Sequence, residues 1–128
     1  MDCIFCKIVN GEIPCYKIYE DDEFLIILDI KPGTNGDMLI ITKKHYADFK
    51  VVPEEVFASA NELAKKMVGL LEERMKCEGA TVWYNYGFVP EVKHFHIHVT
   101  PRYVDDGFKA EYENSKLISL EEIHKLLT

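Results

Sequence analysis

The sequence predicts an α+β fold, in which an antiparallel sheet packs with one long helix and a short C-terminal helix. Two apolar runs, residues 24–28 and 38–42, flank a segment dense in turn formers, residues 31–36, as expected of paired antiparallel strands. Residues 54–78 instead carry apolar side chains at helical spacing. Side chains on both faces of each of these two strands are apolar. We therefore expect both faces of the sheet to be covered.

The N-terminal part before these strands is predicted to be short and mixed. Residues 4–10 favour one or two helical turns, which the Asn10-Gly11 pair ends. Residues 15–19 then favour a short strand, and the acidic residues 20–23 a solvated turn.

The long helix is expected to begin at Pro53, which suits the first helical position, with Glu54 and Glu55 favourable to the helix dipole. Gly79 is expected to end it. Its apolar stripe, which we assign to the core, comprises Val56, Ala60, Leu63, Met67, Leu70 and Leu71.

The second half of the chain is predicted to add two strands and a terminal helix. Residues 81–86 are rich in strand formers, and a turn leads from them to a strand at residues 94–100. Ser119 and Glu122 form a capping box that starts a helix ending at Leu127. We expect a single domain over residues 1–128, with its core at about 3–103 and a tail and helix at 104–128.

Composition narrows the class of partner. The chain has 128 residues and a formal charge of −7, which argues against a nucleic-acid or membrane partner. The sequence contains no apolar run long enough to span a membrane, and its start lacks a signal-peptide pattern. We therefore expect a cytoplasmic protein, in which the cysteines are not a disulfide framework and Cys3 and Cys6, three apart, favour metal binding.

Three of the five histidines alternate along one predicted strand. On a strand His94, His96 and His98 share one face, while the intervening residues enter the core. A neutral imidazole can attack phosphorus, and neighbouring protonated imidazoles would neutralise the phosphoryl oxygens. From the residues alone, His96 is the best-flanked nucleophile and His98 a phosphate contact. Metal ligation by the same histidines is an equally open interpretation at this point.

The histidine strand, His-Phe-His-Ile-His-Val-Thr at residues 94–100, resembles the signature of the histidine triad (HIT) superfamily of nucleotidyl hydrolases and transferases. The opening at residues 3–14 also resembles bacterial members, and residues 28–32, 43–45 and 85–87 fall in the family's order. The resemblance covers most of the chain.

That resemblance implies roles for individual residues. His96 would be the nucleophile that forms a nucleotidyl-histidine intermediate, oriented by the main-chain carbonyl of His94, and His98 would contact the α-phosphate. The implied catalytic set is therefore His94, His96 and His98. The implied nucleotide-binding set is Phe5, Ile8, Ile27, Leu28, Asp29, Ile30, Leu39, Asn85, Glu91, His96 and His98, with Asp29 on the ribose hydroxyls.

The resemblance to bacterial members also implies a structural zinc ion held by Cys3, Cys6, His45 and His94. Two thiolates with two imidazoles make a closed tetrahedral set, which is typical of structural sites.

The expected function is hydrolysis of nucleoside 5′-phosphoramidates or related nucleotide conjugates, with purines favoured, by a homodimer in which two sheets join side by side. The segment at residues 88–91 departs from the family pattern: it is two residues shorter, lacks a Gly-Gln pair and carries Pro90 and Glu91. Asp37 also stands where many relatives have a histidine. Three alternatives stay open: a dinucleoside polyphosphate hydrolase, a zinc-stabilised nucleotide-binding protein with little turnover, and a metalloenzyme holding one catalytic metal on the three histidines.

Overall fold

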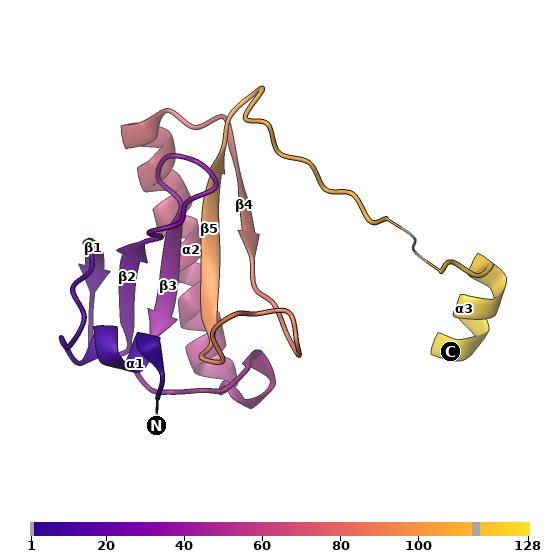
Figure 1. Ribbon diagram of the computed structural model, residues 1–128, viewed down its shortest axis with the longest axis horizontal. Coiled ribbons are helices and arrows are strands. Elements are labelled where there is room, and N and C mark those ends of the chain that lie inside the picture. The colour runs from indigo at the N-terminus through magenta and orange to yellow at the C-terminus, as the bar shows by residue number, and fades with distance from the viewer. Residues whose placement is uncertain (1, 114–115) are drawn as a thin grey trace.

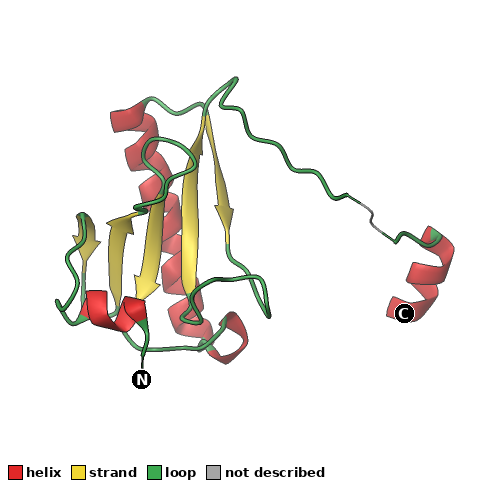
Figure 2. Ribbon diagram, in the orientation of Figure 1, coloured by secondary structure: helices red, strands yellow, loops and turns green. Residues whose placement is uncertain are grey.

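A five-stranded antiparallel sheet separates two helices of unequal length (Figures 1 and 2). The computed structural model describes residues 2–113 and 116–128. The strands are β1 (Lys17–Glu20), β2 (Phe24–Leu28), β3 (Met38–Thr42), β4 (Gly79–Trp83) and β5 (His96–Arg102), in the spatial order β1-β2-β3-β5-β4. The helices are α1 (Ile4–Val9), α2 (Glu54–Met75) and α3 (Leu120–Leu127), with a 3-10 turn at Phe49–Val51. The expected α+β class is confirmed.

Helix α2 covers one face of the sheet and makes the larger core. Its buried side chains follow the expected stripe, with Leu70 only half-buried. The helix begins at Glu54, one residue later than predicted, and Pro53 is its N-cap. The prediction that Gly79 ends the helix is wrong, because Lys76 takes the left-handed conformation (φ 56°) that turns the chain, and Gly79 begins β4 opposite Arg102.

Strand register fixes which residues share a face. Strand β3 pairs with β5 so that Leu39 faces His98 and Ile41 faces His96, and directly opposed residues of an antiparallel pair point to the same side. The intervening Ile97 and Val99 are fully buried against the α2 core. The expected alternation along β5 is confirmed.

The histidine face carries a second, smaller core beneath α1. Phe5 packs there with Leu25, Ile27, Leu39 and Ile41. The sheet is therefore covered on both faces, as the apolar runs predicted, but the short α1 covers only part of this side (Figure 1). The histidines lie on the partly covered side.

Strands β2 and β3 have the predicted bounds, whereas the other strands are shifted by two residues or so. β5 begins at His96, because the Phe95 amide donates to Tyr46 (2.7 Å) outside the ladder. It continues through Pro101, which lies beyond Val99, the last residue of β5 that pairs with β3. With a neighbour on one side only, the missing N–H of the proline is tolerated there.

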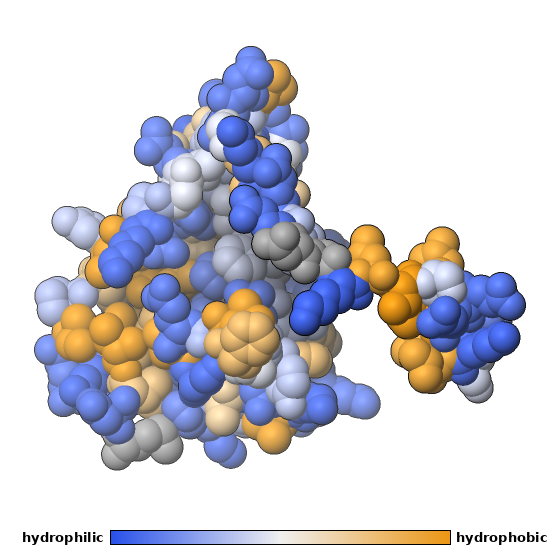
Figure 3. All heavy atoms as spheres, turned by 45° about the vertical axis from the view of Figure 1, so that its right-hand side comes forward, coloured by the Kyte–Doolittle hydropathy of each residue, from blue (hydrophilic) through white to orange (hydrophobic). Residues whose placement is uncertain are grey.

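Beyond Tyr103 the chain leaves the sheet, and α3 lies away from it (Figure 1). The Ser119 side chain accepts from the Glu122 amide (3.2 Å), so Ser119 caps the start of α3 as expected. Apolar side chains of α3 are exposed, among them Leu120 and Leu126, and they gather on one part of this segment (Figure 3). In the described ranges no helix combines the length and apolarity that crossing a membrane requires.

Candidate active site and metal site

The three histidines of the signature divide between two adjoining sites. His96 and His98 project from β5 on the α1 side of the sheet, half-buried. His94 precedes the strand, is 1% exposed, and turns its ring toward Cys3 and Cys6. Among the described residues, the metal-ligand cluster takes in His94 but neither of the others. This separation argues against a single catalytic metal held by all three.

His96 is held in one orientation. Its Nδ1 donates to the main-chain carbonyl of His94 at 2.6 Å. With the proton on Nδ1, the neutral ring keeps its lone pair on Nε2. The Phe5 ring packs edge-on against it, with ring centroids 4.8 Å apart and an interplanar angle of 85°. His96 is thus an oriented imidazole with a free nucleophilic nitrogen.

His98 lies flat against an aromatic ring from the neighbouring strand. Trp83, opposite it in the β4–β5 register, stacks on the imidazole at 3.8 Å between centroids with an angle of 8°. The Trp83 indole Nε1 also donates to Thr100 Oγ1 (3.2 Å). These contacts fix the plane of the His98 ring.

Both rings are biased toward the neutral form. Burial lowers the pKa of His96, although the hydrogen bond to His94 and the charge of Asp29 oppose this. Burial, then the neighbouring His96, lowers the pKa of His98 to about 4, against the opposing charges of Asp29 and Asp37. The expectation of protonated neighbouring imidazoles concerns the phosphate-bound protein and stays a prediction. A bound phosphate, being an anion, would favour protonation of His98.

Cys3, Cys6, His45 and His94 form a compact ligand set. Their four ligand atoms all lie within 4.8 Å of one another. His94 Nδ1 is 3.1 Å from His45 Nδ1 and 3.4 Å from Cys3 Sγ, and Cys6 Sγ is 3.4 Å from His45 Nδ1. A tetrahedral zinc with Zn–N of about 2.0 Å and Zn–S of about 2.3 Å separates its ligand atoms by about 3.3–3.8 Å. The donor set fits a structural zinc ion.

The surroundings of the cluster support metal ligation. His94 Nε2 donates to the Thr42 carbonyl at 2.6 Å, which leaves Nδ1 free to bind a metal, as is usual for ligating histidines. The Phe95–Tyr46 backbone hydrogen bond holds the two histidine-bearing segments side by side. The expected closed Cys₂His₂ site is thus built from three separate parts of the chain.

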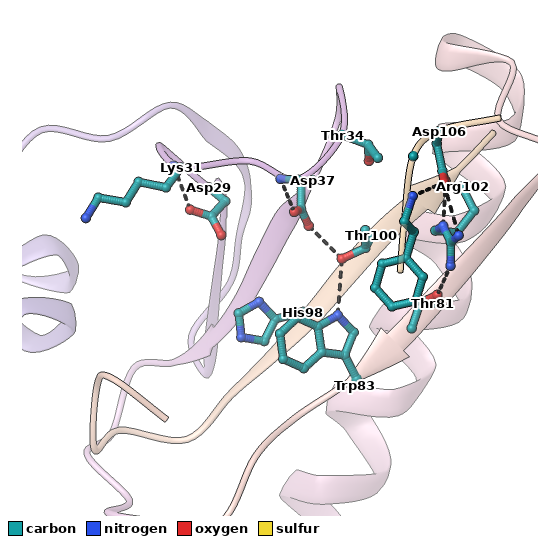
Figure 4. Close-up of a pocket in the computed structure, with 13 residues that line it drawn as sticks. Asp29, Lys31, Thr34, Asp37, Thr81, Trp83, His98, Thr100, Arg102 and Asp106 are labelled. Carbon is teal, nitrogen blue, oxygen red and sulfur yellow. Dashed lines mark hydrogen bonds and ion pairs between the residues drawn. The ribbon is translucent and has the colours of Figure 1, made fainter. Parts of the chain in front are cut away.

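A cavity of about 520 Å³ opens beside His98 and runs along β5 away from α1 (Figure 4). At one end lies Asp29, whose Oδ1 accepts from the Lys31 amide (2.9 Å). At the other end, Arg102 pairs with Asp106 (2.6 Å). Its further lining residues are Lys31, Gly33, Thr34, Asp37, Thr81, Trp83, Thr100, Gly107 and Phe108.

The six apolar residues expected to bind the base are only partly brought together. Phe5, Ile8, Ile27 and Leu39 meet beneath α1. Leu28, one residue after Ile27 on its strand, packs against the opposite, α2-side core. The side chain of Ile30 is 79% exposed. These four residues belong to the small core beneath α1, where the Phe5 ring packs against His96. We call this group of four the α1 slot.

The two polar residues of the loop before β5 lie apart. Asn85 is half-buried, two residues after Trp83, which pairs with His98. Glu91 lines a different cavity of about 540 Å³, next to Cys3 and His45. The structure thus brings Glu91 to the metal side rather than to the His98 cavity.

The sequence did not reveal a hydrogen-bond network at the His98 cavity. Thr100 Oγ1 donates to Asp37 Oδ1 (2.8 Å), and Asp37 Oδ2 accepts from the Gly33 amide (3.0 Å). Trp83 donates to the same threonine. Thr100 is two positions after His98, so period-two alternation could have placed it on the same face. The part played by Trp83 depends on register with β4, which the sequence did not specify.

The fold and this paired site are those of a histidine triad protein with a Cys₂His₂ metal site. The HIT domain family model matches residues 10–105. The chain therefore belongs to the HIT family, whose members bind nucleotides and are typically nucleotidyl hydrolases.

Three relatives show the range of similarity. An uncharacterised HIT-like protein of Methanocaldococcus jannaschii is 39% identical over 125 residues, covering 96% of each chain. Adenylylsulfatase HINT3 of Arabidopsis thaliana is 33% identical, covering 96% of this chain and 69% of that one. The solved structure of a zinc-bound histidine triad family protein from Mycobacterium smegmatis matches with a TM-score of 0.81 and 35% identity, covering 99% of this chain and 91% of its own.

Proposed function

We propose that this protein hydrolyses nucleoside 5′-phosphoramidates or related nucleotide conjugates at the α-phosphorus, with His96 as the nucleophile. The observation that carries the proposal is the 2.6 Å hydrogen bond from His96 Nδ1 to the His94 carbonyl. It leaves the lone pair of Nε2 available for attack. A similar protein bears the name adenylylsulfatase, which supports a nucleotide conjugate as the substrate class.

The first step forms a bond from His96 Nε2 to phosphorus and breaks the bond from phosphorus to the leaving nitrogen. That nitrogen keeps the bonding electron pair, takes a proton from solvent and departs as an amine. The substituted imidazole is then cationic, and the His94 carbonyl, already bound to Nδ1–H, stabilises that charge. The dipole of the His94 carbonyl already points at Nδ1–H, so it does not have to reorient at this step.

The second step is attack by water on phosphorus. The new P–O bond replaces the P–N bond, whose electron pair returns to Nε2, and the proton of the attacking water passes to solvent. The products are a nucleoside monophosphate and the original neutral His96. Dividing one hard displacement into two easier ones is the general advantage of a covalent intermediate.

The other site residues are assigned the roles that the family resemblance implies. His98 contacts the α-phosphate, with Asn85 as a second contact, and Asp29 accepts from the ribose hydroxyls, as suits a carboxylate. The α1 slot receives the base, with purines favoured by the family resemblance.

We also propose a homodimer formed along β4. In the part of the chain that the structure describes, this strand is one of the two edges of the sheet, with β1 as the other, and Val82 and Trp83 on it are 44% and 37% exposed. Unpaired edges readily accept a second strand. Sedimentation velocity of the wild type and of Val82→Pro, which weakens edge pairing, tests this. A wild-type monomer would exclude it.

The test of the catalytic proposal is the mass of the intact protein after brief mixing with an adenosine 5′-phosphoramidate. Wild type should gain one adenylyl group transiently and release adenosine monophosphate. His96→Ala should do neither, whereas His124→Ala, a change on the distant α3, should behave as wild type. Absence of both adduct and product, with the nucleotide still bound, would instead identify a nucleotide-binding protein with little turnover.

A dinucleoside polyphosphate is the second substrate candidate. The cavity of about 520 Å³ that continues past His98 offers room for a leaving group larger than an amine. Comparing kcat/KM for diadenosine polyphosphates and for the phosphoramidate on the same protein separates the two. The substrate with the higher kcat/KM belongs to the preferred class.

A further inference from the structure

Helix α1 and its N-cap contribute residues to both the metal cluster and the α1 slot. Cys3 and Cys6 flank the start of α1, and Phe5 lies between them in the sequence. The Phe5 ring packs edge-on against His96 at 4.8 Å and against His94 at 5.9 Å between centroids. Anything that fixes the two cysteines also fixes Phe5.

His94 provides a second, independent connection between the two sites. Its Nδ1 is within 3.6 Å of both cysteine sulfurs, while its carbonyl accepts the Nδ1 proton of His96. The ring therefore faces the metal cluster, and the main chain of the same residue orients the nucleophile. A shift of the His94 main chain after loss of a metal would move the acceptor that holds His96.

We expect the rest of the fold to be independent of this connection. The larger core, on the α2 side, contains none of the four ligands. By contrast, α1 has six residues, too few for a helix to be stable by itself in water. Its position depends on the cysteines and on the apolar contacts of Phe5 and Ile8. Loss of the metal should therefore loosen α1 and leave the sheet and α2 folded.

We propose that occupancy of the Cys3–Cys6–His45–His94 site and nucleotide binding at the α1 slot are positively coupled, with Phe5 as the positioning residue between them. The inference rests on the proposed nucleotide site. A metal ion would hold α1 and His94 in the arrangement that a nucleotide needs, and a nucleotide in the slot would hold the same groups for the metal. By linkage, each ligand must raise the affinity of the other by one common factor.

The test begins with the zinc-loaded protein and adenosine monophosphate as the probe. Equilibrium competition with a chromophoric chelator gives the zinc Kd with and without saturating nucleotide. We expect the nucleotide to lower the zinc Kd at least about fivefold, the lower end of typical coupling. Titration of nucleotide into loaded and chelated protein should give the same factor.

Two neighbouring variants separate coupling from general stability. Phe5→Leu keeps an apolar side chain but removes the ring between His94 and His96, so the coupling factor should approach one. Ile4→Ala is the matched control, because Ile4 lies in the same segment between the cysteines but is 47% exposed. It should keep the wild-type factor.

A spectroscopic measurement reports on the nucleophile itself. Nitrogen-15 NMR of the histidine rings should show His96 protonated at Nδ1 in loaded protein and a mixture of tautomers after chelation. The methyl signals of Ile97 and Val99, which lie in the α2-side core, should keep their positions. A metal with a purely structural role at its own ligands would leave the His96 tautomer unchanged.

Three results would overturn the proposal. An equal zinc Kd with and without bound nucleotide excludes coupling while leaving the proposed function intact. Collapse of the Ile97 and Val99 signals on chelation shows that the metal holds the whole fold. Failure of the zinc-loaded protein to bind adenosine monophosphate refutes the proposed nucleotide site, and the coupling with it.

Discussion

The indole of Trp83 and the imidazole of His98 lie face to face, 3.8 Å apart and within 8° of parallel. The two residues are opposed in the β4–β5 ladder, so the stack depends on the backbone register and not on a flexible loop. A ring held in this way presents its edge nitrogens to the cavity in a fixed direction.

Replacing Trp83 should therefore affect catalysis through His98. Trp83→Ala should lower kcat/KM for the phosphoramidate about two- to thirteenfold, because an aromatic pair contributes about 0.5–1.5 kcal/mol. Trp83→Phe keeps a ring over His98 but loses the N–H that Thr100 accepts, and should lose less. Steady-state kinetics of both variants show whether the ring stack or the N–H of Trp83 supports catalysis. Equal losses in the two would assign the effect to the N–H instead of the stack.

Thr100 should stabilise the fold through Asp37. Asp37 is 6% exposed, and Thr100→Val removes the hydroxyl that donates to its Oδ1. Leaving a buried acceptor without its donor costs about 1–3 kcal/mol of unfolding free energy. Urea denaturation measures it, with Thr100→Ser, which keeps the hydroxyl, as the control. A Thr100→Val protein as stable as wild type would show that Asp37 finds another donor.

Gly36 should tolerate a side chain less well than Gly11. Both have positive φ angles, +99° and +79°, but a Cβ on Gly36 would lie 2.9 Å from Leu71 Cδ2, whereas Gly11 has open space around it. Gly11→Ala should cost the conformational penalty alone, about 1–2 kcal/mol. Gly36→Ala should cost a further 1 kcal/mol or more, roughly the lower end of overpacking penalties. Thermal and urea denaturation of the pair would contradict this if the two losses were equal.

Acid should destabilise the protein through His98. Its pKa is about 4 in the fold against 6.5 for an unperturbed ring, so between these values the unfolded chain binds more protons. Stability contributed by the neutral buried ring is therefore present above pH 6.5 and is lost as the pH falls toward 4. Unfolding free energies over this range should fall more steeply in wild type than in His98→Asn. Because metal release at low pH is common to both proteins, their difference isolates His98, and parallel curves would refute the assignment.

The sequence was most informative where pattern and turn chemistry agree. The bounds of β2 and β3 follow directly from apolar runs separated by turn formers. The four metal ligands also meet as expected, although they come from three separate segments, because the family resemblance supplied what spacing alone could not. The end of α2 was missed since a left-handed Lys76, which has no sequence signature, turns the chain before Gly79.

The contents of the nucleotide site were harder to predict. Leu28 was grouped with Ile27, yet adjacent strand residues point to opposite faces, and the two lie in different cores. Trp83 and Asp37 reach the His98 cavity through strand register and a buried hydrogen bond. Such contacts join residues far apart in the sequence, so local patterns do not reveal them.

The alternation along β5 gives this protein a practical use. The inward residues Ile97 and Val99 are fully buried and stabilise the sheet, while the outward His96 can be exchanged without disturbing them. An inactive His96→Gln chain should thus remain a folded receptor that retains its cargo instead of cleaving it. Immobilised on a resin, this variant could capture its ligand from small-molecule cell extracts. Mass spectrometry of the eluate would then identify the bound conjugate.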